Sequence, residues 1–207
     1  MKHELQNIIS GKSQVRNGNA FQAISSYIRK GKSSGGTSKS SKQIKSEEAT
    51  LINQFCTNNS FWITSINIDE FVSSGAEQKV YLHNKYKVIK LNDGIYYENW
   101  LDYFNNLLLN NFFFPDTAYQ LIGFYQQNKI LYAVVEQKFV ESDSETDLEN
   151  VNRFLTSNGF LNKKNNDYFH PTLGIILEDL HDENVLTYQG TLFFIDTVFY
   201  ITEQFYK

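Results

Sequence analysis

The stretch ILEDLHDENVL, residues 176–186, decides how the rest of this sequence is interpreted. Its polar residues, Asp179 and Asn184 among them, lie between two apolar segments, and Asp196 follows Asn184 by twelve residues at the end of the apolar run FFI. Asp and Asn in a loop, followed by an Asp that ends a strand, supply oxygen ligands of the kind that Mg²⁺ prefers. Because buried charges are costly unless paired or bound to metal, the segment predicts a metal-binding loop. The alternative is an acidic surface loop in which Asp179 or Asn184 caps a turn.

The composition is that of a globular protein with a substantial core. The chain has 207 residues, 41% of them hydrophobic, which suffices for one compact domain or two small lobes around a shared cleft. Cys56 is the only cysteine, which excludes an internal disulfide and a cysteine-based zinc cluster and favours a reducing compartment. No apolar run predicts a transmembrane helix or a signal peptide. We therefore expect a cytoplasmic protein without a membrane partner.

Charge is distributed unevenly along the chain. Residues 1–45 contain nine Lys and Arg and one acid, for a net charge of +8, whereas the remaining residues carry −12. This contrast predicts a basic N-terminal arm over residues 1–45, with a helix at 20–30 and a Gly/Ser/Lys linker at 31–41. The arm either contacts nucleic acid or an acidic partner, or is a soluble tail or a segment that docks on the acidic body of its own chain.

The periodicity of apolar residues predicts alternating helices and strands. Helices are expected from residue 46, over 98–110 and over 147–158, the last closed by Gly159 as a C-cap. Extended segments are expected over 61–68, 71–91 (strand, turn, strand), 119–125, 129–136 and, as short strands, 174–200. The order predicts an α+β chain whose first sheet is mostly antiparallel. Residues 46–139 would form one lobe and residues 140–207 the other.

A second group of residues suggests a phosphate site. Ser74, Gly75 and Ala76 are small residues at an expected strand turn, where backbone N–H groups can approach phosphate, and Val80 lies on the next strand. Eleven residues after Lys79, Lys90 is predicted on an apolar strand. Its ammonium would neutralise phosphate charge. The alternative is an edge-strand lysine with its charged end in solvent.

The pattern Asp179-x-x-x-x-Asn184 followed by Asp196 resembles the protein-kinase-like superfamily, and its D-L-H wording is closest to aminoglycoside-phosphotransferase-like and other atypical kinases. The resemblance implies that Asp179 orients or deprotonates the acceptor hydroxyl, while Asn184 and Asp196 hold Mg²⁺ against the phosphates. It also implies that Lys90 binds phosphate and is held by an acid on the following helix. Glu98 is the expected acid, with Asp102 as its substitute.

The same resemblance assigns further residues. Glu136 and Gln137 would lie on the strand and connector that contact adenine through the backbone. His181 would contact the transferred phosphate or brace the loop, and His170, before Pro171, is interpreted as structural.

The sequence also resembles the polyvalent-protein kinase family, whose members are bacterial kinase-like domains associated with mobile elements. The resemblance runs from about residue 8 to residue 200 and is carried by SSGAEQKVYL, KVIKLND, FFPDTAYQLIGFY, LEDLHDENVL and FFIDTVFY. It implies a reduced protein-kinase-like fold, with an antiparallel N-lobe sheet, one helix and a truncated C-lobe, that uses ATP and Mg²⁺ on an unknown acceptor. Asp196 is followed by Thr197 and Val198 where typical kinases have Phe-Gly, and eleven residues follow it. A nucleotide-binding pseudokinase or interaction module, and a nucleic-acid-associated protein using the basic arm, are the alternatives.

Overall fold

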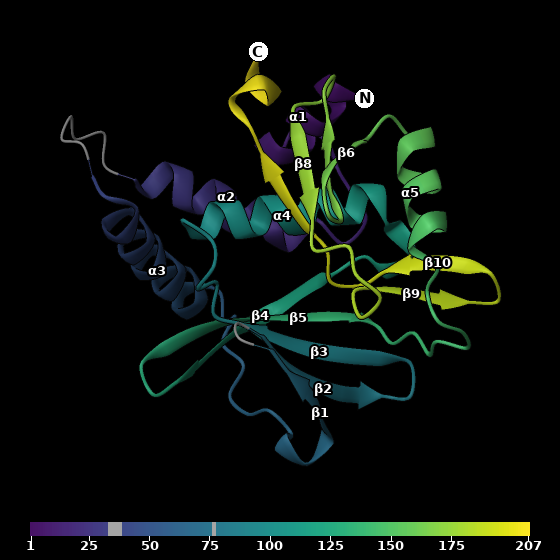
Figure 1. The fold of residues 1–207 in the computed structure, drawn as a ribbon. Coiled ribbons are helices and arrows are strands. Elements are labelled where there is room, and N and C mark those ends of the chain that lie inside the picture. Colours follow the sequence, from purple (N-terminus) through teal and green to yellow (C-terminus); the bar gives the residue numbers. More distant parts are fainter. Residues whose placement is uncertain (33–38, 76–77) are drawn as a thin grey trace. The chain divides into compact units, whose positions relative to one another are not determined.

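Antiparallel sheets and helices form the fold, as the sequence predicted. The computed structural model describes residues 1–32, 39–75 and 78–207, so Ala76 and most of the expected linker lie outside the described residues. The helices are α1 (Lys2–Ser10), α2 (Asn19–Gly31), α3 (Ser41–Asn58), α4 (Trp100–Phe113) and α5 (Leu148–Ser157), with short 3-10 turns η1 (Ile68–Glu70), η2 (Pro115–Thr117) and η3 (Glu203–Tyr206) (Figure 1). The strands are β1 (Phe71–Ser74), β2 (Gln78–Asn84), β3 (Lys87–Asn92), β4 (Gln120–Gln127), β5 (Ile130–Lys138), β6 (Leu161–Lys164), β7 (Asp167–His170), β8 (Ile175–Glu178), β9 (Val185–Tyr188), β10 (Thr191–Phe194) and β11 (Val198–Ile201).

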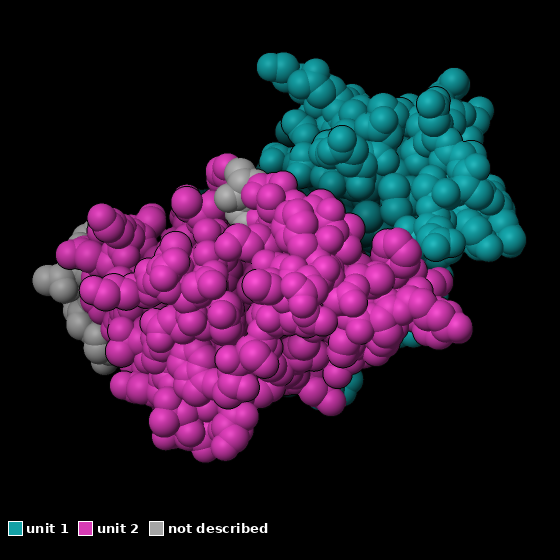
Figure 2. Space-filling view, turned by 90° about the horizontal axis from the view of Figure 1, so that it is seen from below, with its two compact units in different colours: residues 1–16, 105–118, 140–207 teal, residues 17–104, 119–139 magenta. Residues whose placement is uncertain are grey.

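The chain divides into two compact units, which Figure 2 distinguishes by colour. Unit 1 comprises Met1–Arg16, Asn105–Ala118 and Val140–Lys207, and unit 2 comprises Asn17–Phe104 and Tyr119–Phe139. The N-terminal residues therefore belong partly to unit 1 and partly to unit 2. Burial gives the physical reason, because α1 and α2 each bury an apolar face, made of Leu5, Ile8 and Ile9 in α1 and of Phe21, Ile24 and Ile28 in α2.

Unit 2 is built on one five-stranded antiparallel sheet with the order β1-β2-β3-β5-β4. Because successive side chains of a strand point to opposite faces, the sheet has two distinct surfaces. One surface carries an apolar cluster that includes Tyr81, Leu91 and Val134. On the other, the ring of Phe124 in β4 contacts those of Trp100 and Phe104 at the start of α4. Helices α2 and α3 are neighbours in this unit (Figure 1).

Unit 1 contains a four-stranded antiparallel sheet with the order β11-β8-β7-β6 and the separate β9–β10 hairpin. Strand β8 is an interior strand of this sheet, so the loop that follows Glu178 starts from a fixed position. Helix α1 lies beside the last turn of the chain (Figure 1). Lys2 Nζ donates to the carbonyl oxygen of Gln204 at 2.7 Å, and Gln6 Nε2 donates to that of Phe205 at 2.6 Å.

Several element boundaries differ from the predictions for local reasons. Helix α3 begins at Ser41 because Ser40 and Gln43 form a capping box five residues before the expected start. Residues 61–68 form an isolated bridge to β4 and no strand. The bridge lies against Gly123, where a Cβ atom would come within 2.8 Å of the Phe61 carbonyl oxygen. Helix α1 and the β6–β7 hairpin, whose turn has Asn165 at φ 52°, were not predicted. No helix in the described ranges is both long and apolar enough to cross a bilayer.

A buried carboxylate holds the start of α4. Glu48 of α3 has no exposed surface, and its Oε2 accepts hydrogen bonds from the backbone N–H groups of Trp100 at 2.6 Å and Leu101 at 3.3 Å. Its Oε1 lies 2.6 Å from Lys32 Nζ. The first N–H groups of a helix lack partners within the helix and carry partial positive charge, so an anion there is stabilising.

Replacing this carboxylate tests whether it anchors α4. Glu48→Ala should lower the free energy of unfolding by about 2–3 kcal/mol, because hydrogen bonds to a charged group are lost and buried N–H groups are left unpaired. Urea denaturation measures the change. Glu47→Ala is the matched control, since Glu47 is the preceding residue and pairs with Lys39 at a partly exposed position, where a loss below about 1 kcal/mol is expected. Equal losses in the two variants would contradict the anchoring role.

Candidate functional site

The loop from Asp179 to Asn184 in unit 1 is closed by its own hydrogen bonds. Asn184 Nδ2 donates to the carbonyl oxygen of Asp179 at 2.9 Å, and the N–H groups of Asn184 and Val185 both donate to the carbonyl oxygen of His181. Asp179 takes a left-handed conformation with φ 68°, which Asp tolerates better than most residues. The loop bonds hold Asp179 in this conformation.

Three side chains of this loop lie within reach of one another. His181 Nε2 is 3.0 Å from Asn184 Nδ2 and 3.4 Å from Asp179 Oδ1. With a proton, Nε2 can donate to the Asp179 carboxylate, and without one it can accept from the Asn184 amide. The predicted catalytic residue therefore shares its surroundings with both the predicted metal ligand and His181. The Asp179 side chain is 55% exposed, so an acceptor hydroxyl can reach it.

The β9–β10 hairpin connects Asn184 to the segment of Asp196. Val185 is paired with Phe194 at the open end of the hairpin, and one step beyond, the Ile195 N–H donates to the Asn184 carbonyl oxygen at 2.9 Å. Asp196 follows directly, in the bend before β11. The structure thus brings together the backbone positions of the two predicted metal ligands, which are twelve residues apart in sequence.

The donor set fits a magnesium ion. Both side-chain contacts of Asn184 use Nδ2, and within the described ranges no group donates to its Oδ1, which leaves that oxygen for a cation. Together with the Asp196 carboxylate this is an all-oxygen set. Among residues 1–32, 39–75 and 78–207, no three His, Cys, Asp or Glu side chains are arranged to hold a metal. A site made of one Asn, one Asp and phosphate oxygens needs only one such side chain.

Lys90 in unit 2 lies on an interior strand. It is 4% exposed and pairs with Val80 on one side and Val135 on the other, and its Nζ lies 5.4 Å from the centre of the Tyr119 ring. The alternative interpretation, an edge-strand lysine with its charged end in solvent, is therefore wrong. Val80 faces the same side of the sheet as Lys90, as the nucleotide-site prediction requires.

The β1–β2 turn carries Ser74 and Gly75. Ser74 pairs with Lys79, and the Gly75 N–H donates to the Gln78 carbonyl oxygen at 2.8 Å, which closes the turn. A Cβ atom added to Gly75 would meet no atom of the described residues within 4 Å. This N–H is therefore used by the hairpin itself, while the open space leaves room for a ligand close to the backbone.

Glu136 points away from the surface that Lys90 faces. It pairs with Ile89, whereas Lys90 pairs with Val135, so the two side chains project from opposite faces. Glu136 is held by the Lys87 ammonium and by His83 Nδ1 at 2.8 Å. Burial raises the pKa of Glu136, but the hydrogen bonds and positive charges of Lys87 and His83 outweigh burial and hold that pKa below its usual range. A nucleotide on the Lys90 face could meet Glu136 only through its backbone. The buried Gln137 side chain is on the Lys90 face.

The expected helical partners of Lys90 have other surroundings. Glu98 is exposed and precedes α4, which begins at Trp100, so its predicted helical position is wrong; no described residue forms an ion pair with it. Asp102 is bonded to the residue that caps the helix: its N–H donates to Asn99 Oδ1, and Asn99 Nδ2 donates to its carboxylate at 2.5 Å. Burial, and then the negative charges of Glu48 and Glu98, raise the pKa of Asp102 to about 6.

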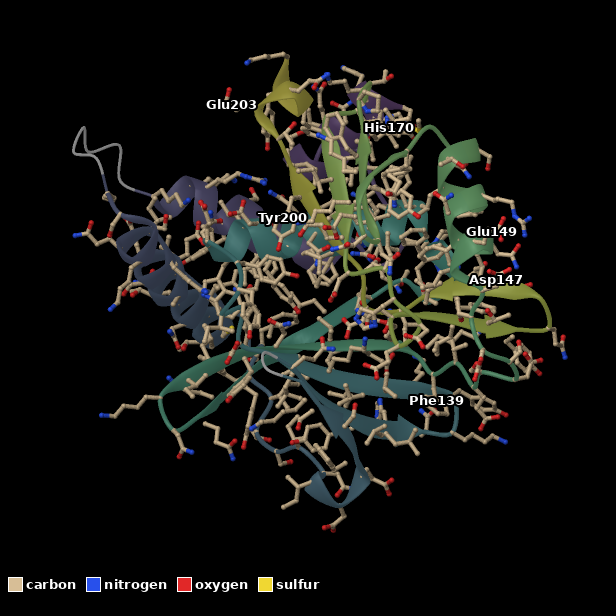
Figure 3. All side chains as sticks on the ribbon, viewed as in Figure 1. Phe139, Asp147, Glu149, His170, Tyr200 and Glu203 are labelled. Atoms are coloured by element: carbon tan, nitrogen blue, oxygen red, sulfur yellow. The ribbon has the colours of Figure 1, made fainter. Side chains whose placement is uncertain are left out.

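His170 has the surroundings of a structural residue, as its sequence position suggested. It is 6% exposed at the end of β7, and its Nδ1 accepts a hydrogen bond from the Leu173 N–H at 3.3 Å (Figure 3). Its ring lies edge-on to Phe160, and burial lowers its pKa. The imidazole is thus held neutral.

The sequence interpretation overlooked the polar residues that hold the Asp196 segment. Asn106 and Asn110 of α4, together with Thr117 and Thr197, are all buried and hydrogen-bonded around residues 194–199. The signal was present in α4, where Asn residues stand one helical turn apart among leucines and aromatic residues. When an Asn side chain is buried at such a position, its amide must be hydrogen-bonded.

A pocket of about 600 Å³ lies between the start of α5, labelled at Asp147 and Glu149 in Figure 3, and the β9–β10 hairpin. Its lining includes Glu145, Asp147, Phe154 and Phe194. Its lining includes none of the predicted catalytic, nucleotide or metal residues that the structure describes. Phe194, one of the lining residues, precedes Asp196 by two residues.

Comparison with known proteins agrees with the resemblance drawn from the motifs. Residues 45–203 match the family described as serine/threonine/tyrosine kinases found in polyvalent proteins. The matched range includes residues of both units and every predicted site residue from Ser74 to Asp196. Searches among curated proteins and among solved structures gave no significant match.

The surroundings of Asp102 lead to a pH-dependent prediction. A folded-state pKa near 6, above the unfolded value, means that stability falls as pH rises from about 4 to 6 and stays lower above that range. Asp102→Asn should therefore raise the melting temperature at pH 7.5 and have little effect at pH 4. The exposed Asp116→Asn variant is the control and should change little at either pH. A loss of stability in Asp102→Asn at pH 7.5 would instead indicate that the carboxylate has a favourable partner, as a pair with Lys90 requires.

Proposed function

The chain belongs to the family of serine/threonine/tyrosine kinases found in polyvalent proteins, and from this premise we propose that it transfers the γ-phosphoryl group of ATP to an acceptor hydroxyl. The observation that carries the proposal is the hydrogen-bonded arrangement of Asn184 beside the segment of Asp196, with Asp179 in the same loop. Positioning and charge neutralisation supply most of the catalysis in such a transfer.

Each proposed role follows from a local feature of the chain. In the reaction, the acceptor oxygen forms a bond to the γ-phosphorus as the bond to the bridging oxygen breaks, ADP leaves, and the hydroxyl proton passes to a carboxylate oxygen of Asp179. Asn184 Oδ1 and the Asp196 carboxylate would hold Mg²⁺, which neutralises phosphate charge when bound. The Lys90 ammonium would bind phosphate oxygens. His181, 3.4 Å from Asp179, would keep that carboxylate oriented toward the acceptor.

The fold we propose is a reduced protein-kinase-like one. The five-stranded sheet with Lys90 on its third strand, and with α4 between β3 and β4, supports an N-lobe. The β1–β2 turn at Ser74 and Gly75 would cover the phosphates, and the end of β5 at Gln137 would contact adenine. Residues 140–207 would form the reduced C-lobe. The bacterial mobile-element setting is part of the same proposal.

A catalytically silent nucleotide-binding protein is the second candidate, favoured by one specific observation. Thr197 and Val198 replace the Phe-Gly that follows the metal-binding Asp of typical kinases. Such a protein would bind Mg²⁺ and ATP through Asn184 and Asp196 but transfer nothing. Nucleic-acid binding through the basic residues of positions 1–45 stays a prediction of the sequence.

Nucleotide binding is tested by thermal unfolding. Mg²⁺ and ATP at about 100 times the dissociation constant should raise the melting temperature by roughly 5–10 °C. The shift should be lost in Asp196→Asn, because a metal ligand is removed. It should persist in Asp182→Asn, an exposed acid of the same loop without a proposed role. A wild-type protein that shows no shift would refute the proposal.

Phosphoryl transfer is tested with Asp179→Asn, which should keep the Mg²⁺-ATP shift but lower γ-phosphoryl transfer by about 10²-fold or more. Transfer of labelled phosphate to hydroxyl-bearing peptides and small molecules measures this. Asp182→Asn again serves as the control and should transfer phosphate at the wild-type rate. Binding without measurable transfer in the wild type would favour the silent alternative.

A further inference from the structure

Four asparagine side chains of α4 are buried within unit 1, and two of them, Asn106 and Asn110, bond to the segment around Asp196. Asn106 is 3% exposed and Asn110 is 2% exposed, and both lie in a helix that is otherwise mainly apolar and aromatic. A buried amide without hydrogen bonds would cost about 1–3 kcal/mol. Buried Asn106 and Asn110 must therefore have hydrogen-bond partners, and these partners indicate their role.

Asn110 and Thr197 bind each other reciprocally. Thr197 Oγ1 donates to Asn110 Oδ1 at 3.0 Å, and Asn110 Nδ2 donates to the Thr197 carbonyl oxygen at 3.1 Å. Asn106 Oδ1 extends the network, because it accepts from Asn110 Nδ2 at 2.8 Å and from the Phe199 N–H at 2.7 Å. The segment directly after Asp196 is thus fixed to α4 through its backbone as well as its side chain.

The segment before Asp196 is fixed independently. Thr117 Oγ1 donates to the Phe194 carbonyl oxygen at 2.6 Å, and the Phe114 and Phe194 rings stack at 4.0 Å with 7° between their planes. The Ile195 N–H is bound to the Asn184 carbonyl oxygen. Asp196 therefore lies between two anchored stretches of backbone, and its Cα has little freedom to move relative to Asn184.

We propose that Asn110 and Thr197 are positioning residues that hold Asp196 in its metal-binding direction. The inference rests on the proposed function, since it concerns the same magnesium site. In typical kinases, packing of the Phe after the metal-binding Asp sets the active or inactive state. Here a threonine bonded to a buried asparagine occupies that position. Asp196 is consequently ready to bind metal without a switch of this segment.

The test compares two substitutions at Thr197. Thr197→Val keeps the shape of the side chain and removes the hydroxyl donor, whereas Thr197→Ser keeps the donor. The measurement is the Mg²⁺ concentration that gives half of the ATP-dependent rise in melting temperature. It should increase about tenfold in Thr197→Val, the size expected for one buried hydrogen bond, and stay within about twofold of wild type in Thr197→Ser. Activity at saturating Mg²⁺ should fall much less than the Mg²⁺ midpoint rises.

Asn111→Ala provides a matched control for Asn110→Ala. Asn111 is the next residue of α4, is 1% exposed, and donates from Nδ2 to the Arg16 carbonyl oxygen at 2.8 Å, away from the Asp196 segment. Both variants should lose stability in urea. Asn110→Ala should shift the Mg²⁺ midpoint, because that amide is bonded to Thr197, whereas Asn111→Ala should leave the midpoint unchanged, since Asn111 Nδ2 bonds to Arg16.

The outcomes separate this inference from the function on which it rests. A wild-type protein without any Mg²⁺-dependent shift contradicts the proposed function, and the positioning role with it. A normal wild-type midpoint that is unchanged in Thr197→Val and Asn110→Ala overturns the positioning role alone. An equal shift in Asn111→Ala would also overturn it, because general destabilisation would then explain the effect.

Discussion

The hydrogen bond from the Ile195 N–H to the Asn184 carbonyl oxygen is the contact on which the proposed site depends. It closes the β9–β10 hairpin one residue beyond the last ladder pair and thereby makes Asn184 and Asp196 near neighbours. The eleven residues between them form the hairpin, whose ladder runs from the Thr191–Tyr188 pair to the Phe194–Val185 pair. Two further hydrogen bonds fix the ends of this hairpin. Asn184 bonds to Asp179 at one end, and Thr197 bonds to Asn110 at the other.

Buried polar groups fix particular segments within each unit. In unit 2, the Glu48 carboxylate holds the first N–H groups of α4, and in unit 1 the Asn110 amide of the same helix holds the segment after Asp196. Such groups are costly to bury and gain little net stability, but each has only a few geometries in which its hydrogen bonds are satisfied. These hydrogen bonds therefore fix where α4 begins and how the segment after Asp196 runs. Apolar packing alone fixes such positions less strictly.

The sequence predicted the elements whose signal is local. Alternation over residues 71–91 and the apolar runs near 119–136 gave the central strands, and Gly159 gave the end of α5. Predictions failed where tertiary contacts decide: Glu98 was expected inside a helix that begins at Trp100 because Asn99 and Glu48 cap it there. The spacing of Asp179, Asn184 and Asp196 identified the candidate site, but it could not show that Asn110 and Thr197 support it, because that contact joins residues 87 positions apart. Likewise, only the strand register shows that Glu136 and Lys90 face opposite sides of the sheet.

The central claim, that Asn184 and Asp196 form a magnesium–nucleotide site, is tested most directly by a crystal structure of the protein with Mg²⁺ and a non-hydrolysable ATP analogue. The account predicts a metal ion at roughly 2.0–2.1 Å from Asn184 Oδ1 and from an Asp196 carboxylate oxygen, completed by phosphate and water oxygens. It also predicts Lys90 Nζ within hydrogen-bond distance of a phosphate. A nucleotide bound elsewhere, or a metal held without Asn184 and Asp196, would contradict the account.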